Sequence, residues 1–453
     1  MGAAMEQDDA DLARATFGRV SVRIIPFLFV LYLFNQLDRT NVAIAALQMN
    51  RDLHFSAAAY GFGVGVFFIS YALLEVPSNL ILARVGARRW IARIMITWGL
   101  ISAATLFVRT PGQFYAIRFL LGVAEAGFFP GVLYYLSEWF PAPQLGLAMA
   151  GFMIAIPLSS AIGGPFGGWL LGFDGHLGLR GWQWLYLVEG IPSTLLGLVV
   201  FLYLTDKPEE ARWLSDEQRG WLVARLRRDH LERTAEPHLA LLRVLLNPLL
   251  WLLSTACFIY LTTSYTLSFW APIVIRDALH TKDATTGWVV GAIGALSACA
   301  GLLAAAHSDR RGERFLHAAA GVGLMGVGFI VAALFPTGWG SVTGLLFIGI
   351  GARIFQPPFW CIPTLMLGGT AAAAGLAFIN SIGNIGGFVG PYAVGLAKDA
   401  TGGTRGVFLV FGVLALGASG LLVALRRNKA FAPGGRQTDA YLPPDVAVGG
   451  QKA

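Results

Sequence analysis

The chain has 453 residues, of which 56% are hydrophobic and only 13% carry a charge. So little charge over this length is not expected of a soluble protein, and it predicts a membrane protein. The net charge of +7 does not indicate nucleic-acid binding, because most Lys and Arg lie in loops between apolar runs, where they set membrane topology. Three widely separated cysteines within apolar runs predict neither a disulfide framework nor a metal site, and we expect no cofactor.

Twelve apolar runs are long enough to cross a bilayer, which takes about 20 residues. Each is predicted to be a helix, because lipid offers no partner for backbone N–H and C=O groups. The first 20 residues are polar and acidic, so we expect the first run to be a mature span rather than a cleaved signal. The runs lie near residues 24–46, 58–83, 90–108, 113–137, 145–172, 183–204, 247–272, 285–306, 316–335, 341–366, 372–397 and 405–425.

Twelve spans place both termini on one side of the membrane. The segments on that side hold 23 Lys and Arg and the opposite loops hold seven, which predicts cytoplasmic termini. The one long polar segment between spans contains SDEQ followed by helical apolar spacing, and it predicts a short amphipathic helix over residues 215–233. The expected domains are a tail (1–23), a six-helix bundle (24–204), a linker (205–246), a second bundle (247–425) and a tail (426–453).

The two halves repeat. Aligning Gly86 with Gly312 in the loops after the second and eighth runs gives an offset of 226 residues, and Pro165 with Pro391 gives the same offset. An offset of half the chain length predicts tandem six-helix repeats. In transporters built from parallel repeats the substrate binds between them near the bilayer midplane.

Four charged residues interrupt two of the spans: Asp38 and Arg39 in the first, Arg118 and Glu125 in the fourth. A charge at bilayer mid-depth costs at least about 2.5–3.5 kcal/mol, so such residues normally face a polar cavity. Arg118 and Glu125 share a helix face but lie about 10 Å apart along the axis, too far for a simple direct pair. We expect Arg118 to bind a carboxylate with its forked guanidinium and Glu125 to carry a proton. A permanent salt bridge is the structural alternative.

Polar residues in other spans are weaker candidates. Arg353 precedes two prolines that free backbone carbonyls, so it either binds substrate or caps those carbonyls. Asn380 and Asn384 share a helix face and can bond across the bundle or to a hydroxylated ligand. Trp360 is a cavity wall or ordinary packing. Glu75 is expected to be a packing carboxylate paired with a loop arginine.

Several strings together resemble the major facilitator superfamily, and within it the anion:cation symporter group. They are RVGARR, SDRRGER, GGPFGG, YLFNQLDRTNVAIA, LLEVPSNLILARVGARRWIARI, RFLLGVAEAGFFPGVLYYLSEWFP and FINSIGNIGGFVGPY, and the resemblance covers about residues 20–425. Three features depart from the family pattern. Ala83 stands before Arg84 where an Asp is usual, the loops after the fourth and tenth runs lack Lys and Arg, and Arg353 replaces a small or apolar residue.

The resemblance implies an all-α fold of two pseudo-symmetric six-helix bundles in a bacterial inner membrane, and no enzymatic activity. It implies proton-coupled uptake of a small organic anion such as tartrate, a sugar acid or an aromatic carboxylate. The sequence does not indicate an oligomeric state, and a monomer is the default expectation. Sodium coupling, exchange, drug or metabolite export and nutrient sensing remain alternatives. The implied proton-coupling residues are Asp38 and Glu125. The implied substrate ligands are Arg39, Arg118, Tyr71, Arg353, Trp360, Asn380 and Asn384. The loop residues Arg84, Arg88, Arg89, Asp309 and Arg310 are gating contacts or topology determinants.

Overall fold

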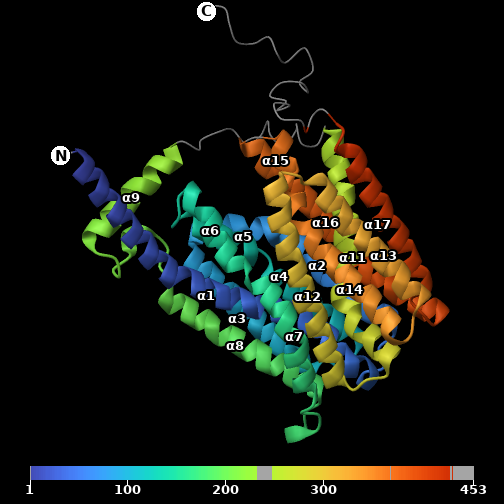
Figure 1. The fold of residues 1–453 in the computed structure, drawn as a ribbon. Coiled ribbons are helices and arrows are strands. Elements are labelled where there is room, and N and C mark those ends of the chain that lie inside the picture. Colours follow the sequence, from blue (N-terminus) through green and yellow to red (C-terminus); the bar gives the residue numbers. More distant parts are fainter. Residues whose placement is uncertain (1, 232–246, 368, 429–430, 432–453) are drawn as a thin grey trace, which may run out of the picture. The chain divides into compact units, whose positions relative to one another are not determined.

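The computed structural model describes residues 2–231, 247–367, 369–428 and 431, and these contain helices but no strand. The predicted all-α class is confirmed (Figure 1). The long helices of the amino-terminal part are α1 (Gly2–Asp52), α2 (Ala57–Val85), α3 (Ala87–Ala104), α4 (Pro111–Glu125), α5 (Phe128–Ser137), α6 (Ala142–Met153), α7 (Ala155–Leu171) and α8 (Gly181–Tyr203). Those of the carboxyl-terminal part are α11 (Pro248–Leu279), α12 (Asp283–Arg311), α13 (Phe315–Leu334), α14 (Gly338–Cys361), α16 (Gly369–Thr401) and α17 (Arg405–Leu425).

Among the described residues, eleven helical segments are long and apolar enough to cross a membrane. Four of these segments combine consecutive helical elements: α3 with η1 (Thr105–Phe107), α4 with α5, α6 with α7, and α14 with α15 (Pro363–Met366). The predicted span at 372–397 lies in α16, which is 33 residues long. Short elements lie between the spans: η2 (His176–Gly178), η3 (Pro208–Glu210) and α9 (Asp216–Leu231).

The chain divides into two compact units that differ from the two sequence halves at two helix ends. The first unit comprises residues 1–54, 66–234 and 283–291, and the second comprises 55–65, 235–282 and 292–453. In the first unit α3 packs along α8, and α1 packs on α7 and α8. In the second unit α13 packs against α14 and α17, and α11 packs against α16 (Figure 1). The start of α2 therefore belongs to the second unit, and the start of α12 to the first.

Glycines explain why these two helix starts pack so closely where they do. In the second unit, a Cβ on Gly61 of α2 would lie 2.4 Å from the carbonyl oxygen of Pro391. In the first unit, a Cβ on Gly287 of α12 would lie 2.3 Å from the carbonyl oxygen of Gly164. Small residues let helix backbones approach each other closely in a membrane. The glycine–proline strings singled out in the sequence therefore act as packing surfaces here.

The amino-terminal tail and the linker both contain helix. Helix α1 runs without interruption from Gly2 into the first span, so the predicted tail is helical from residue 2 onward. In the linker, Ser215 Oγ accepts a hydrogen bond from the N–H of Gln218 and begins α9, as the SDEQ pattern predicts. The predicted end of that helix at residue 233 lies outside the described residues.

The fourth predicted span is broken, and the expectation of one helix over 113–137 was wrong. Helix α4 ends at Glu125, and Gly127 begins α5 with a left-handed φ of 87°. Pro130 then occupies the first turn of α5, where its missing N–H is tolerated. The Ser78 hydroxyl donates to the Ala126 carbonyl at 2.6 Å and satisfies part of the interruption. The break places a candidate proton carrier at a helix end.

We expect Gly127→Ala to destabilise the protein strongly. A non-glycine residue held at this positive φ costs on the order of 1–3 kcal/mol, and a Cβ here would lie 2.4 Å from Ser78 Oγ. Thermal unfolding of the purified protein in detergent measures the effect. Gly112→Ala on α4 is the matched control, because no atom lies within 4 Å of its added Cβ. Equal melting temperatures for the two variants would show that the helix break does not require glycine at position 127.

Asp399 caps the start of α2 within the second unit. Its carboxylate accepts the backbone N–H groups of Ala57 and Ala58, each at 2.9 Å. Burial opposes ionisation of this carboxyl, but the hydrogen bonds from Ala58, Ser56 and Ala57 outweigh it and lower the pKa of Asp399 below its ordinary value of 3.8. An anionic cap at a helix amino terminus is also favoured by the helix dipole.

Asp399→Ala should therefore lower stability by about 1 kcal/mol, the usual cost of losing a cap. Because the folded-state pKa lies below the ordinary value, the contribution is complete above about pH 4 and is lost as the pH falls through the folded-state pKa. The melting-temperature difference from wild type should thus stay constant from neutral pH to about pH 4 and shrink below it. Asp11→Ala, an exposed carboxylate on α1, is the control. A melting-temperature difference that does not change with pH would show that the cap does not depend on the negative charge of Asp399.

Candidate functional site

Asp38 is buried in the first unit among polar side chains of α1 and α3. The Asn41 amide, one turn along α1, donates to Oδ1 at 3.0 Å. From α3, the Trp98 indole N–H donates to Oδ2 and the Ser102 hydroxyl donates to Oδ1. Trp98 and Ser102 are four residues apart and so share one helix face. Three donors replace the water that an ionised carboxylate loses on burial.

Arg39, the next residue of α1, forms an ion pair with Glu125. Its Nε donates to Glu125 Oε1 at 3.0 Å, and its Nη2 donates to the same oxygen. The Glu125 side chain is 1% exposed and that of Arg39 is 19% exposed. This pair was not predicted from the sequence, because it joins residues 86 positions apart. The pair becomes possible because Glu125 ends α4 just before the break.

Arg118 is 1% exposed and lies beside the same aromatic ring as Arg39. Its guanidinium carbon is 5.0 Å from the Phe67 ring centroid, and that of Arg39 is 5.4 Å from it. Arg118 also interacts electrostatically with Asp38. Two guanidinium groups beside one aromatic ring offer two ligands for an anion, and in a low-dielectric interior their attraction for a carboxylate is far stronger than in water.

Tyr71 and Glu75 of α2 complete this cluster. The Tyr71 ring lies 5.2 Å from the Arg39 guanidinium carbon, and the tyrosine is buried. Glu75 interacts electrostatically with Arg39 of α1, so the expected pairing with a loop arginine was wrong. The reason is its position one turn beyond Tyr71, on the side of α2 that approaches the Arg39 side chain. The cluster therefore contains more carboxylates than the sequence analysis assigned to it.

Glu189 of α8 is the residue that the sequence analysis missed. It is 2% exposed and interacts with both Asp38 and Asn41. The signal was available, because Glu189 is an acidic residue in the predicted span at 183–204, and the same criterion singled out Arg118 and Glu125.

The predicted ligands of the carboxyl-terminal half lie in the second unit. Arg353 and Trp360 are on α14, and Asn380 and Asn384 are on α16; all four are half-buried. Arg353 interacts electrostatically with Tyr260 of α11, and its Cβ packs against Gly301 of α12. The structure thus brings Asp38, Arg39, Tyr71, Arg118 and Glu125 together in the first unit, and places the other four in the second.

The loop after α2 is anchored by an aspartate from the end of the first bundle. Asp206 accepts the backbone N–H of Arg88 at 2.7 Å, where the chain turns through Gly86 with φ 98°. The Arg88 guanidinium also lies 3.9 Å from this carboxylate. Arg84 and Arg89 are exposed. Asp206 thus supplies to the start of α3 the carboxylate that Ala83 does not provide within the loop.

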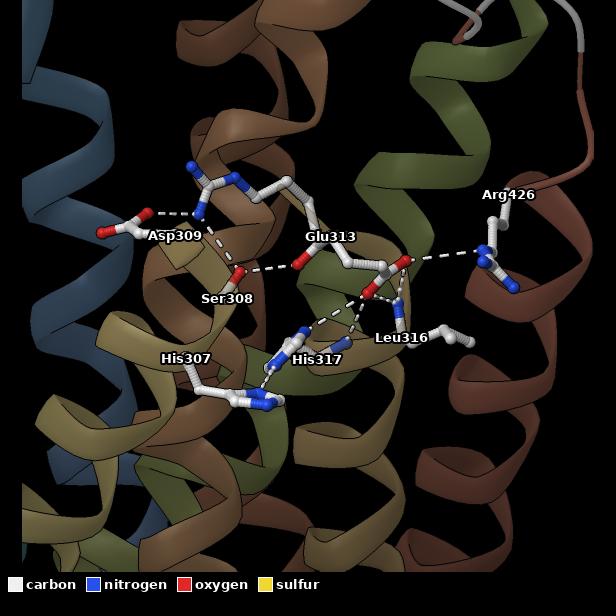
Figure 2. Close-up of polar contacts among 8 residues, drawn as sticks. His307, Ser308, Asp309, Glu313, Leu316, His317 and Arg426 are labelled. Carbon is white, nitrogen blue, oxygen red and sulfur yellow. Dashed lines mark hydrogen bonds and ion pairs between the residues drawn. The ribbon is translucent and has the colours of Figure 1, made fainter. Parts of the chain in front are cut away.

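The matching loop after α12 has a denser polar network, shown in Figure 2. Asp309 pairs with Arg314 at 2.5 Å, while Arg310 is exposed.

Glu313 caps α13 by accepting the N–H of Leu316 at 2.8 Å. The same side chain also contacts His317 at 3.3 Å and Arg426 at 3.4 Å. His307 Nδ1 and His317 Nε2 are 2.8 Å apart. Within the described chain, no three His, Cys, Asp or Glu residues are arranged to hold a metal ion.

Many long apolar helices, with a charged cluster buried inside one helical unit, are typical of a multi-pass membrane transporter. The sequence profile of the Major Facilitator Superfamily matches residues 28–391, and the chain belongs to that family. The superfamily resemblance is thereby confirmed.

Relatives span nearly the whole chain. An Agrobacterium vitis protein named "Putative tartrate transporter" is 44% identical over 424 residues, covering 92% of this chain and 96% of that protein. The "Quinolone resistance transporter" of Acinetobacter baumannii is 39% identical over 402 residues, covering 86% and 90%. The crystal structure of a bacterial homolog of the human lysosomal transporter Spinster has a TM-score of 0.75 at 16% identity, covering 92% and 98%, which shows the shared fold.

Proposed function

We propose that this transporter imports a small organic anion together with protons, by alternating access across a bacterial inner membrane, with both termini cytoplasmic. The observation that carries the proposal is the buried Arg39–Glu125 ion pair beside Arg118. One carboxylate already occupies one of two neighbouring arginines. A carboxylate substrate can therefore compete for the same group.

Protonation of Glu125 would decide that competition. A neutral Glu125 no longer holds Arg39 by charge, so Arg39 and Arg118 can both bind the substrate carboxylate. Loss of the proton on the cytoplasmic side, where the pH is higher, restores the ion pair and expels the anion. Coupling of this kind is a difference in proton affinity between loaded and empty states, and it acts equally in both directions. Asp38 is proposed as the second proton site.

Four residues of the second unit are proposed as further substrate ligands. Arg353 offers a ligand for a second carboxylate, and Asn380 and Asn384 offer amides for hydroxyl groups. Trp360 would line the same binding surface. This set fits tartrate, a sugar acid or an aromatic carboxylate, and the Agrobacterium vitis relative, whose name refers to tartrate, supports the first of these. The loop residues Arg84, Arg88, Arg89, Asp309 and Arg310 are proposed to control closure of the cytoplasmic side.

Transport by the purified protein in sealed liposomes tests this function. With the exterior acidic relative to the interior, tartrate, galactonate, glucarate and phthalate are offered one at a time, and accumulation is measured. We expect one of them to accumulate above its external concentration, with accumulation abolished by a protonophore. Accumulation that follows a sodium gradient in its place would reject proton coupling. No uptake or exchange of any organic acid would reject the function.

Export is the second candidate, because the Acinetobacter baumannii relative is named for quinolone resistance and is 39% identical. Two arginines in the cluster favour an anionic substrate over a cationic drug. The two functions differ in a growth assay. An exporter raises the tolerance of expressing cells to a quinolone, whereas an importer supports growth on an organic acid and leaves tolerance unchanged.

A further inference from the structure

Glu189 is a buried carboxylate that the proposed mechanism does not yet use. It lies eight residues into α8, roughly 12 Å along the helix from its start at Gly181. It is 2% exposed. An ionised carboxylate at such a position needs a cation or several donors to offset its lost hydration.

The hydrogen bonds around Glu189 do not meet that need. Among the described residues, its Oε2 atom is buried and has no hydrogen-bond partner. Its polar contact is with Asn41 of α1, and the hydroxyl of Tyr186, one turn earlier on α8, likewise has no partner. The Asn41 Oδ1 atom is also buried without a donor. A proton on Glu189 would remove the charge and supply a donor beside an oxygen that lacks one.

Asp38 presents the opposite arrangement through the same asparagine. Its two oxygens accept three hydrogen bonds, from Asn41, Trp98 and Ser102. Donors of this kind favour the ionised form of a carboxyl group. Asp38 and Glu189 repel each other when both are ionised, and a single proton on one of them removes that repulsion.

We propose that Asp38, Asn41 and Glu189 together form one of the proton-binding sites of transport, and that the proton resides on Glu189. We call these three residues the carboxyl triad. Glu189 is the protonated member and Asp38 the ionised member, with Asn41 bridging them. The inference rests on the proposed proton symport, and it moves the second transported proton from Asp38 to the pair.

Electrostatic interactions link the carboxyl triad to Arg118, the proposed substrate ligand. From α4, Arg118 and Glu125 act electrostatically on Asp38. On α8, Tyr186 interacts electrostatically with Arg118, Asp38 and Glu189. Helix α7 contains no titratable residue, and the arginines of α3 lie in its first two turns. When a substrate anion binds Arg118, that arginine stabilises the ionised pair less, and proton affinity of the pair rises. Proton and anion would therefore bind cooperatively.

Infrared spectroscopy of the full-length protein in detergent tests the proton directly. At neutral pH we expect the carbonyl-stretch band of a buried protonated carboxyl group in the wild type, and loss of that band in Glu189→Gln. The exposed Glu217→Gln on α9 is the matched control and should keep the band. In Asp38→Asn the neighbouring charge is gone, so the band should disappear at a lower pH than in the wild type. An unchanged band in Glu189→Gln would overturn the proposal.

Transport provides the second readout and separates this inference from the proposed function. In liposomes, Glu189→Gln should carry one proton fewer per substrate than wild type while still exchanging substrate. Wild-type vesicles that move no organic acid would reject the symport function, whereas the infrared band would still test the proton on Glu189. Wild-type symport combined with an unchanged proton-to-substrate ratio in Glu189→Gln would reject the inference alone. If Glu189→Gln does not fold, the wild-type and Asp38→Asn titrations decide, and identical titrations overturn the proposal.

Discussion

Arg118→Ala is expected to abolish substrate binding and transport. The guanidinium is 1% exposed and lies 5.0 Å from the Phe67 ring centroid, so no solvent can replace it as an anion ligand. Truncating one member of a buried charge pair costs about 2–5 kcal/mol, which is a loss of affinity of at least about thirtyfold. Arg118→Lys should retain the charge but lose the forked geometry, and it should bind with intermediate affinity.

Binding is measured by the thermal shift that the transported anion produces in the purified protein. Arg405→Ala is the control, because Arg405 is an exposed arginine at the start of α17. The control should show the wild-type shift. A full shift in Arg118→Ala, with wild-type uptake, would remove Arg118 from the substrate site and leave it a structural arginine.

The spans and most of the charged cluster could be predicted because the bilayer imposes strict rules on sequence. A run of about 20 apolar residues has few alternatives to a spanning helix, and a charge within it requires a polar surrounding. That rule found Asp38, Arg39, Arg118 and Glu125. The same rule applies to Glu189, so this residue could also have been predicted from the sequence.

Other features depend on contacts between residues distant in sequence, and hydropathy does not encode them. The Arg39–Glu125 pair requires α1 and the end of α4 to meet, and the Asp399 cap joins residues more than 300 positions apart. The helix break is an intermediate case. Gly127 followed by Pro130 is a local signal for a helix end, but the apolar run around it was read as continuous.

Glu125→Gln is expected to separate transport from the proton gradient. Glutamine has the shape of a protonated glutamate and carries no charge, so Arg39 would be released from its ion pair permanently. The variant should bind the anion at least as well as the wild type and should exchange internal for external substrate at a comparable rate. It should not accumulate substrate against a gradient, because no proton is bound and released at this position in each cycle.

The comparison of two assays on the same vesicles makes this prediction specific. Counterflow exchange needs only alternating access, whereas accumulation under a pH gradient needs coupling. Glu138→Gln, at a half-buried glutamate immediately after α5, is the matched control and should retain both activities. If Glu125→Gln accumulates substrate as the wild type does, the proton is carried elsewhere, and the Arg39–Glu125 ion pair is a structural link rather than the point where proton and anion compete. If it loses exchange as well, the carboxylate is needed to position Arg39, and release of the ion pair by protonation cannot be the transport step.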